Sequence, residues 1–255
     1  MAEKVMSLAG HLDELRRRSI AVFVCFLAFS SIAFYHIQTL LGWVKIPAGD
    51  LIGPLAVLSP TSALLVFIKL SAAVGLAMTV PIFLIHVWSF VRPALDEGWS
   101  VVGLVFIVGG TLLFLSGASL GFFVLAPASL RFLLNIGREQ LQFIITLDEY
   151  VSFVLALGLA GGTVFQMPLI VYVLAKVGLL TAALMIRGWR IAMVLILIIA
   201  GIATPTPDVF NMLIMAVPML VLYGISIVVA GMAARPATPN GSSLSPIGSA
   251  PSVRR

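Results

Sequence analysis

The stretch HLDELRRRSI, residues 11–20, places two carboxylates just ahead of three consecutive arginines. In a helix, Asp13 can pair with Arg17 and Glu14 with Arg18, because side chains four residues apart share a face. A carboxylate also binds a guanidinium from another molecule in a bidentate fork. Two interpretations stay open: the pairs solubilise an interfacial helix, or Glu14 faces an external cationic partner.

Three further polar residues lie in or beside long apolar segments. Gln166 is near the middle of one, where an amide forms an interhelical hydrogen bond or serves as a docking point for a partner helix. Lys69 lies near the end of another, where its amine can snorkel to the surface, and we group it with Gln166 as an intramembrane polar site. Asp208 follows TPTP, so it either caps the next helix or serves a function there.

The sequence GASLG, residues 117–121, matches the nucleophile pattern G-x-S-x-G. That pattern requires a strand–turn–helix context, whereas these residues lie in a predicted membrane helix. Gly117 and Gly121 are therefore predicted to form a small-xxx-small packing face, and Gly158 and Gly162 repeat the spacing. An intramembrane hydrolase is disfavoured.

The composition indicates an integral membrane protein, because 61% of the 255 residues are hydrophobic and 10% are charged. The net charge of +5 comes from basic residues between apolar segments, which does not favour nucleic acid as a partner. Membrane lipid is the expected surrounding. One cysteine and three scattered histidines give neither a disulfide nor a metal site, and we expect no cofactor.

Six segments are apolar enough to span a bilayer, and they predict an all-α membrane fold. They are residues 19–41, 63–90, 99–125, 151–177, 190–204 and 209–231. The fifth offers about 22 Å of helix against a hydrocarbon core of about 30 Å. Prolines inside the second, fourth and sixth segments predict kinks and a curved bundle: Pro81, Pro168 and Pro218.

An even number of spans places both termini on one side. A cytoplasmic N-terminus leaves four of the 15 Lys and Arg residues outside, which fits the positive-inside rule. We therefore expect a cytoplasmic amphipathic helix over residues 1–18, a membrane domain over 19–231 and a disordered cytoplasmic tail over 232–255. The first segment is too long for a cleavable signal peptide, and a prokaryotic cell membrane is the expected location.

Several short stretches, taken in order, resemble one family. They are HLDELRRR, IGPL at residues 52–55, FIKL at 67–70, VWSFVRPAL at 87–95, VFQMPL at 164–169 and TPTPDVFN at 204–211. With six spans, the chain resembles the TatC family, the core receptor subunit of the twin-arginine protein translocase, over about residues 8–230.

The resemblance implies a glove-shaped bundle of six transmembrane helices that binds twin-arginine signal peptides of folded cargo. It also implies TatA-like and TatB-like single-span partners, a homo-oligomer within a larger complex, export driven by the proton-motive force, and no enzymatic activity. The alternative from the residues alone is a small-solute transporter or channel, because a bent bundle with a mid-membrane polar residue can line a pathway.

The resemblance also implies roles for individual residues. Signal-peptide binding would fall to His11, Glu14, Leu15, Arg16, Phe90, Pro93, Asp96 and Glu97, with Pro54 and Asp208 in outer loops. Two positions depart from the family pattern. Trp99 stands where a second signal-binding glutamate is common, so Asp96 or Glu97 would replace it, and Gln166 stands where the family often has a glutamate.

Overall fold

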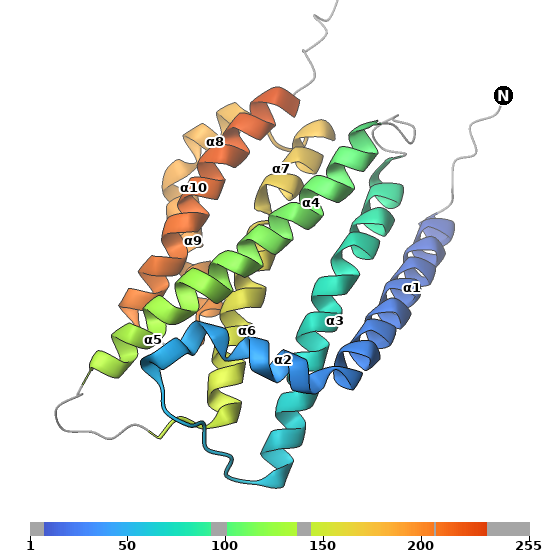
Figure 1. Ribbon diagram of the computed structural model, residues 1–255. Coiled ribbons are helices and arrows are strands. Elements are labelled where there is room, and N and C mark those ends of the chain that lie inside the picture. Colours follow the sequence, from blue (N-terminus) through green and yellow to red (C-terminus); the bar gives the residue numbers. More distant parts are fainter. Residues whose placement is uncertain (1–7, 93–100, 137–143, 207, 234–255) are drawn as a thin grey trace, which may run out of the picture.

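The computed structural model describes residues 8–92, 101–136, 144–206 and 208–233, which form a bundle of helices (Figure 1). In chain order the elements are α1 (Leu8–Tyr35), α2 (Ile37–Val44), the 3₁₀ helix η1 (Ile46–Leu51), α3 (Pro60–Val91), α4 (Val101–Leu120), the π-helical turn η3 (Gly121–Leu125), α5 (Ala126–Asn135), α6 (Leu147–Val164), α7 (Met167–Lys176), α8 (Ala182–Arg187), α9 (Trp189–Ala203) and α10 (Val209–Ala233). The expected all-α architecture is confirmed.

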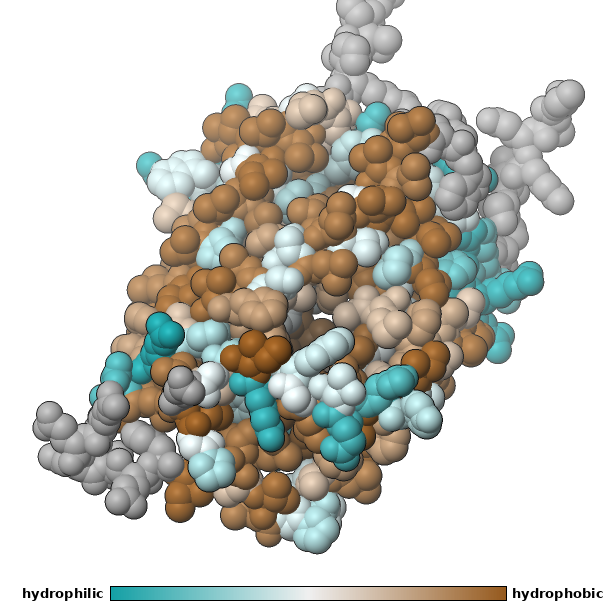
Figure 2. Space-filling model, viewed as in Figure 1, coloured by the Kyte–Doolittle hydropathy of each residue, from teal (hydrophilic) through white to brown (hydrophobic). Residues whose placement is uncertain are grey.

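Five helical stretches of the described residues are long and apolar enough to cross a membrane. They are Asp13–Tyr35, Pro60–Val91, Val101–Asn135, Leu147–Lys176 and Val209–Ala233. Helix α9 is shorter, with 15 residues. It corresponds to the fifth expected segment, residues 190–204, which was expected to be short. Brown apolar surface covers most of the face in Figure 2, and large side chains such as Leu104 are more than half exposed, as lipid contact requires.

The first apolar segment divides into two helices. Helix α1 is continuous from Leu8 to Tyr35, so the amphipathic stretch and the first span form one rod. The chain then breaks at His36, and α2 lies across the bundle (Figure 1). The expected span to residue 41 is therefore wrong at its end, because Ile37, Leu40 and Val44 bury one face of α2 against the bundle.

The third and fourth segments are also interrupted. Helix α4 passes through the π-helical turn into α5, so the third helical stretch extends to Asn135 rather than to the expected residue 125. Helix α6 ends at Val164, and α7 begins at Met167 with Pro168 in its first turn, so the segment is interrupted where a kink was expected. Pro81 and Pro218 lie inside continuous helices.

Close backbone contact joins α4 to α6. A methyl group added to Gly117 would collide with the carbonyl oxygen of Gly161, and one added to Gly121 with that of Leu157. The expected packing role of Gly117 and Gly121 is thus confirmed. Gly162 packs against the ring of Phe114, whereas a methyl group on Gly158 would meet only the Ala118 oxygen, at 3.9 Å.

The start of α1 and the end of α10 lie at the same end of the bundle (Figure 1). Helix α10 runs to Ala233, two residues beyond the expected end of the membrane domain. The remaining residues of the expected tail, 234–255, lie outside the described residues, and the division of the chain at residue 18 stays a prediction.

Candidate functional site

A cavity of about 580 Å³ opens between α1 and α3, which lie side by side in Figure 1. We call it the α1–α3 groove. Its lining is mostly apolar and comprises Leu15, Arg18, Ser19, Val22, Phe23 and Phe26 of α1, eight residues of α3 between Leu76 and Phe90, and Phe114, Thr163 and Gln166 from behind. Such a long apolar groove with a few polar groups suits a peptide or another chain with an apolar side.

An ion pair between Glu14 and Arg18 lies at one end of this groove. The Arg18 Nε donates a hydrogen bond of 3.0 Å to Oε1 of Glu14, and its Nη2 donates to the same oxygen. The third nitrogen, Nη1, donates to the carbonyl oxygen of His86 in α3, at 3.1 Å. One of the two predicted pairs is therefore confirmed, and it also ties α1 to α3.

The other predicted pair, Asp13 with Arg17, does not form among the residues that the structure describes. Asp13, Arg16 and Arg17 are all exposed. An ion pair between two exposed side chains contributes little free energy, whereas Arg18 is also held by the His86 carbonyl oxygen of α3.

The expected signal-binding residues are only partly described. His11 lies in the first turns of α1, Leu15 is 45% exposed at the groove, and Phe90 is half-buried in its lining. Pro93, Asp96 and Glu97 lie outside the described residues, as does Trp99. The structure thus brings together Glu14, Leu15 and Phe90 around one end of the groove.

Gln166 lies at the junction of α6 and α7 and reaches α4. Its Nε2 donates a hydrogen bond of 2.9 Å to the carbonyl oxygen of Gly110, which confirms the predicted interhelical hydrogen bond. Its Oε1 is buried and has no hydrogen-bond partner among the described residues. Gln166 is one of the residues that line the groove, so an unpaired buried acceptor lies in its wall.

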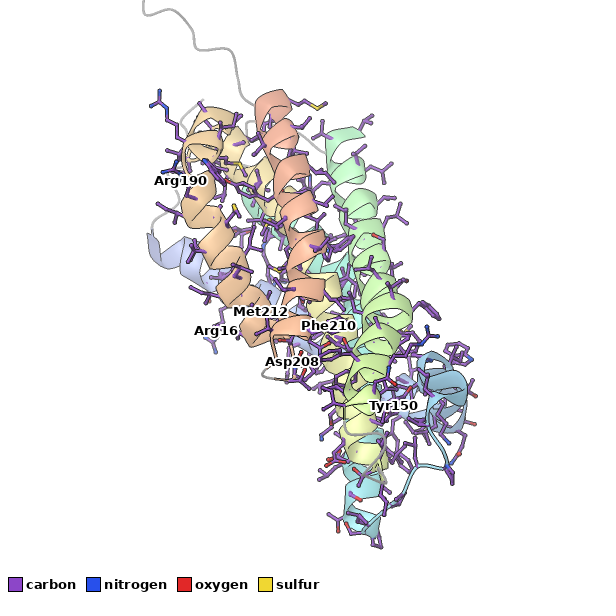
Figure 3. All side chains as sticks on the ribbon, turned by 90° about the vertical axis from the view of Figure 1, so that its left-hand side faces the viewer. Arg16, Tyr150, Arg190, Asp208, Phe210 and Met212 are labelled. Carbon is purple, nitrogen blue, oxygen red and sulfur yellow. The ribbon has the colours of Figure 1, made fainter. Side chains whose placement is uncertain are left out.

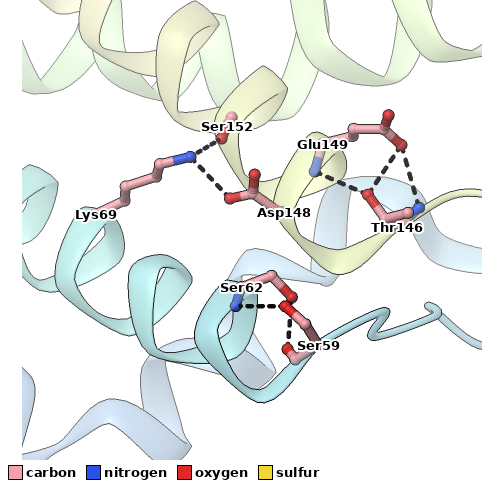
Figure 4. Close-up of polar contacts among 7 residues, drawn as sticks. All are labelled: Ser59, Ser62, Lys69, Thr146, Asp148, Glu149 and Ser152. Carbon is pink, nitrogen blue, oxygen red and sulfur yellow. Dashed lines mark hydrogen bonds and ion pairs between the residues drawn. The ribbon is translucent and has the colours of Figure 1, made fainter.

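Lys69 pairs with Asp148 across the gap between α3 and α6 (Figure 4). Its Nζ lies 2.7 Å from Oδ1 of Asp148 and 3.0 Å from the Ser152 hydroxyl. The capping box formed by Thr146 and Glu149 fixes the start of α6 beside it. Lys69 does not line the groove and bonds to Asp148 and Ser152 instead, so the structure does not bring it together with Gln166 as one polar site.

Asp208 caps α10, as one of its two interpretations required. Its Oδ1 accepts from the backbone N–H of Asn211 and its Oδ2 from the Asn211 side chain, both at 2.8 Å. Burial raises the pKa of Asp208, but these hydrogen bonds and one with Thr206 outweigh it and hold the pKa below its ordinary value. Figure 3 shows Asp208 with Phe210 and Met212 at the start of α10.

Pro54 is exposed in the segment between η1 and α3. That segment is held by Ala56, which pairs with the chain around Thr146 through two backbone hydrogen bonds. Neither Pro54 nor Asp208 lines the α1–α3 groove.

Neither metal nor nucleophile chemistry is built from the described residues. No group of three His, Cys, Asp or Glu side chains in that part of the chain lies close enough to hold a metal ion. Ser119 of GASLG is an exposed residue of α4, and its neighbouring glycines serve helix packing.

Sequence reasoning missed two contacts that hold helices of the bundle together. The Tyr150 hydroxyl donates to the Val44 carbonyl oxygen at 2.8 Å and holds α2 against α6. Trp88 is fully buried at the end of α3 and packs on Gly103 and Phe106 of α4. The amphipathic spacing of Ile37, Leu40 and Val44 could have revealed α2, whereas nothing local marks Trp88 as a packing anchor.

Comparison with known proteins gives consistent matches along nearly the whole chain. The family model of the Sec-independent protein translocase protein TatC matches residues 10–218. The TatC protein of Aquifex aeolicus is 38% identical over 234 residues, which cover 90% of this chain and 97% of that protein. TatCd of Bacillus subtilis is 35% identical over 227 residues, 89% of this chain and 92% of that one.

Solved structures agree with the sequence matches. A crystal structure of the twin-arginine translocase receptor TatC, 35% identical, superposes with a TM-score of 0.78 and covers 88% of this chain and 100% of that chain. The residue range of the family match includes Glu14, Arg18, Gln166 and Asp208.

Proposed function

The chain belongs to the TatC family of Sec-independent protein translocase proteins, and we propose that it is the receptor for twin-arginine signal peptides of folded precursor proteins. It is a multi-pass membrane protein that functions in protein translocation. The observation that carries the proposal is the position of the Glu14 carboxylate at one end of the apolar α1–α3 groove.

The Glu14 carboxylate and the apolar groove would make different contributions to signal-peptide binding. A half-exposed ion pair contributes about 0.2–1 kcal/mol, whereas micromolar affinity requires about 8 kcal/mol. The carboxylate therefore supplies selectivity for a guanidinium, whose planar fork lysine cannot copy. The apolar segment of the signal peptide supplies most of the affinity by burial in the groove.

The remaining recognition residues surround the same end of α1 and α3. Leu15 and Phe90 would contact the signal peptide beside its arginines, with His11 and Arg16 completing the N-terminal motif. Beyond Phe90, Pro93 would shape the loop, and Asp96 or Glu97 would receive the second arginine.

Assembly completes the proposed function. Single-span TatA-like and TatB-like subunits would bind the bundle, and the buried Gln166 oxygen offers one acceptor to a partner helix. The protein would act without cofactor or enzymatic activity, as a homo-oligomer within a larger complex driven by the proton-motive force. Its location would be a prokaryotic cell membrane, with both termini in the cytoplasm.

Site-specific photocrosslinking in native membranes tests the receptor proposal. Probes at Leu15 and Phe90 leave Glu14 intact, and a probe at Leu58, which is 79% exposed outside the groove, serves as the control. Precursors carry either paired arginines or paired lysines in the signal. We expect crosslinks from the two groove probes to the arginine precursor alone, and their loss in Glu14→Gln. Equal crosslinking of both precursors, or none from either groove probe, would contradict the proposal.

A further inference from the structure

The carboxylate proposed to receive a signal arginine already holds an arginine of its own chain. Both Nε and Nη2 of Arg18 donate to the same oxygen, Oε1 of Glu14. Within the described residues, Oε2 of Glu14 accepts no hydrogen bond. We propose that Arg18 is an intramolecular competitor, which a signal arginine must displace from Glu14. This inference rests on the proposed receptor function.

The burial of the pair shows how firmly Arg18 is held. The Arg18 side chain is 19% exposed, whereas the Glu14 side chain is 33% exposed. Arg18 also donates to the His86 carbonyl oxygen in α3, 3.1 Å away, so both helices fix the guanidinium. A guanidinium with partners on two helices is pre-organised, and it occupies Oε1 without any ligand present.

The geometry makes displacement necessary for a fork-like contact. A bidentate guanidinium uses both oxygens of one carboxylate, and Arg18 occupies Oε1. When Arg18 leaves Oε1, it keeps its hydrogen bond to the His86 carbonyl oxygen, so the guanidinium is not left without a hydrogen-bond partner. One ion pair breaks as another forms, which makes the exchange nearly balanced and the capture of cargo reversible.

This exchange predicts the effect of Arg18 on affinity. Self-pairing reduces the fraction of receptors with a free Glu14, and the apparent dissociation constant rises by the same factor. An exposed ion pair corresponds to about a two- to five-fold change. Removal of Arg18 should therefore strengthen signal-peptide binding, although it removes a contact within the receptor.

The chain provides a matched control in the neighbouring residue. Arg17 is exposed, lies on the same helix turn and has no ion pair with Glu14 among the described residues. Arg17→Gln removes the same positive charge as Arg18→Gln but leaves the Glu14 pair intact. Arg18→Lys keeps the positive charge but cannot donate two hydrogen bonds from one planar group to Glu14. It therefore separates the effect of the guanidinium geometry from the effect of the charge.

The test measures binding of a fluorescent twin-arginine signal peptide to the full-length protein in lipid nanodiscs. We expect Arg18→Gln to bind about two- to five-fold tighter than the wild type, Arg17→Gln to bind like the wild type, and Arg18→Lys to lie between. The salt dependence should steepen in Arg18→Gln alone, because that variant gains an ion pair on binding whereas the wild type exchanges one. A purely structural role of Arg18 would not change this slope.

The remaining outcomes discriminate between explanations. Weaker or unchanged binding by Arg18→Gln, with the variant folded, would overturn the competitor role, and so would equal tightening by Arg17→Gln. If Arg18→Gln does not fold, Arg18→Lys decides: an affinity equal to that of the wild type would also overturn the competitor role. Glu14→Gln tests the receptor function separately. If Glu14→Gln retains full preference for paired arginines, the receptor role assigned to Glu14 is wrong, independent of the results for the Arg18 variants.

Discussion

Only one of the two polar atoms of the Gln166 side chain has a hydrogen-bond partner among the described residues. Its nitrogen bonds to the Gly110 carbonyl oxygen, whereas its oxygen is buried without a partner. A buried acceptor that lacks a partner costs free energy until a donor arrives. The Gln166 nitrogen therefore makes one structural hydrogen bond, and its oxygen is left as an unpaired acceptor in the groove wall. A neutral amide is sufficient for both interactions.

Replacing Gln166 by leucine separates these two contributions. The lost hydrogen bond should lower the free energy of unfolding by at most about 0.6 kcal/mol, because leucine also removes the unpaired buried oxygen. Export should fall much further because the partner's acceptor is gone. Thermal unfolding in detergent and an export assay measure the two effects. Thr163→Val is the control, since its hydroxyl bonds to its own helix at Leu159 and it too lines the groove. A stability loss large enough to explain the export defect would contradict the docking role.

The Asp208 cap should make part of the stability depend on acid pH. Because the folded pKa lies below its ordinary value, the ionised cap stabilises the protein above the ordinary pKa. This contribution starts to be lost as the pH falls to the ordinary pKa of an aspartate, and it is gone once the pH has fallen through the lower folded pKa.

Two variants isolate the cap at Asp208. Asp208→Ala should cost about 1 kcal/mol of unfolding free energy at neutral pH, because it removes the cap from Asn211. Asp208→Asn keeps one acceptor oxygen and should lose less. Chemical denaturation across the pH range should show the difference between wild type and Asp208→Asn shrinking in acid. A difference that stays constant to low pH would show that the charge does not stabilise the cap.

At the scale of helices, the contact between α4 and α6 depends on particular glycines. Methyl groups on Gly117 and Gly161 would each strike a backbone oxygen of the other helix, which cannot move without separating the helices. Gly117→Ala and Gly161→Ala should therefore each cost at least about 1–3 kcal/mol. Gly158→Ala should be neutral or stabilising by up to about 1 kcal/mol, because alanine favours the helix and space is available. Unfolding in detergent compares the three, and equal losses would contradict this account of the contact.

The apolar pattern predicted helices well where a run is uniform and ends at polar residues. The expected 63–90 and 209–231 correspond to α3 at Pro60–Val91 and α10 at Val209–Ala233. The pattern failed at α2, because hydropathy cannot distinguish a helix that continues from one that turns at His36 and lies across the bundle. It also failed at α5, where the helix goes on beyond the apolar run.

Contacts between helices at the site could not be predicted from the sequence, because they depend on how the helices pack. The spacing of Glu14 and Arg18 predicted their ion pair, but the contact of Arg18 with His86 depends on how α1 is rotated against α3. Nothing in the residues 11–20 specifies that rotation. The groove, which needs both helices in place, was likewise not predictable from either one.

At the scale of the whole molecule, the charges predict how the bundle sits in the membrane. Arg190 lies at the end of α9 opposite the turn that carries Asp208 (Figure 3), and Arg187 precedes it on the same side. The Glu14 end of α1 lies at that end of the bundle in Figure 1. By the positive-inside rule we expect this end to face the cytoplasm, where precursor proteins are made.

Cysteine labelling tests this orientation in intact cells. In a Cys25→Ser background, we place single cysteines at Leu58, 79% exposed before α3, and at Leu179, 70% exposed after α7. A membrane-impermeant maleimide should label the cysteine at position 58 directly and the one at position 179 only after the membrane is permeabilised. Permeabilised cells control for intrinsic reactivity at both positions. The reverse pattern would place Glu14 outside the cell, where it could not meet a precursor before export, and would contradict the receptor proposal at its first step.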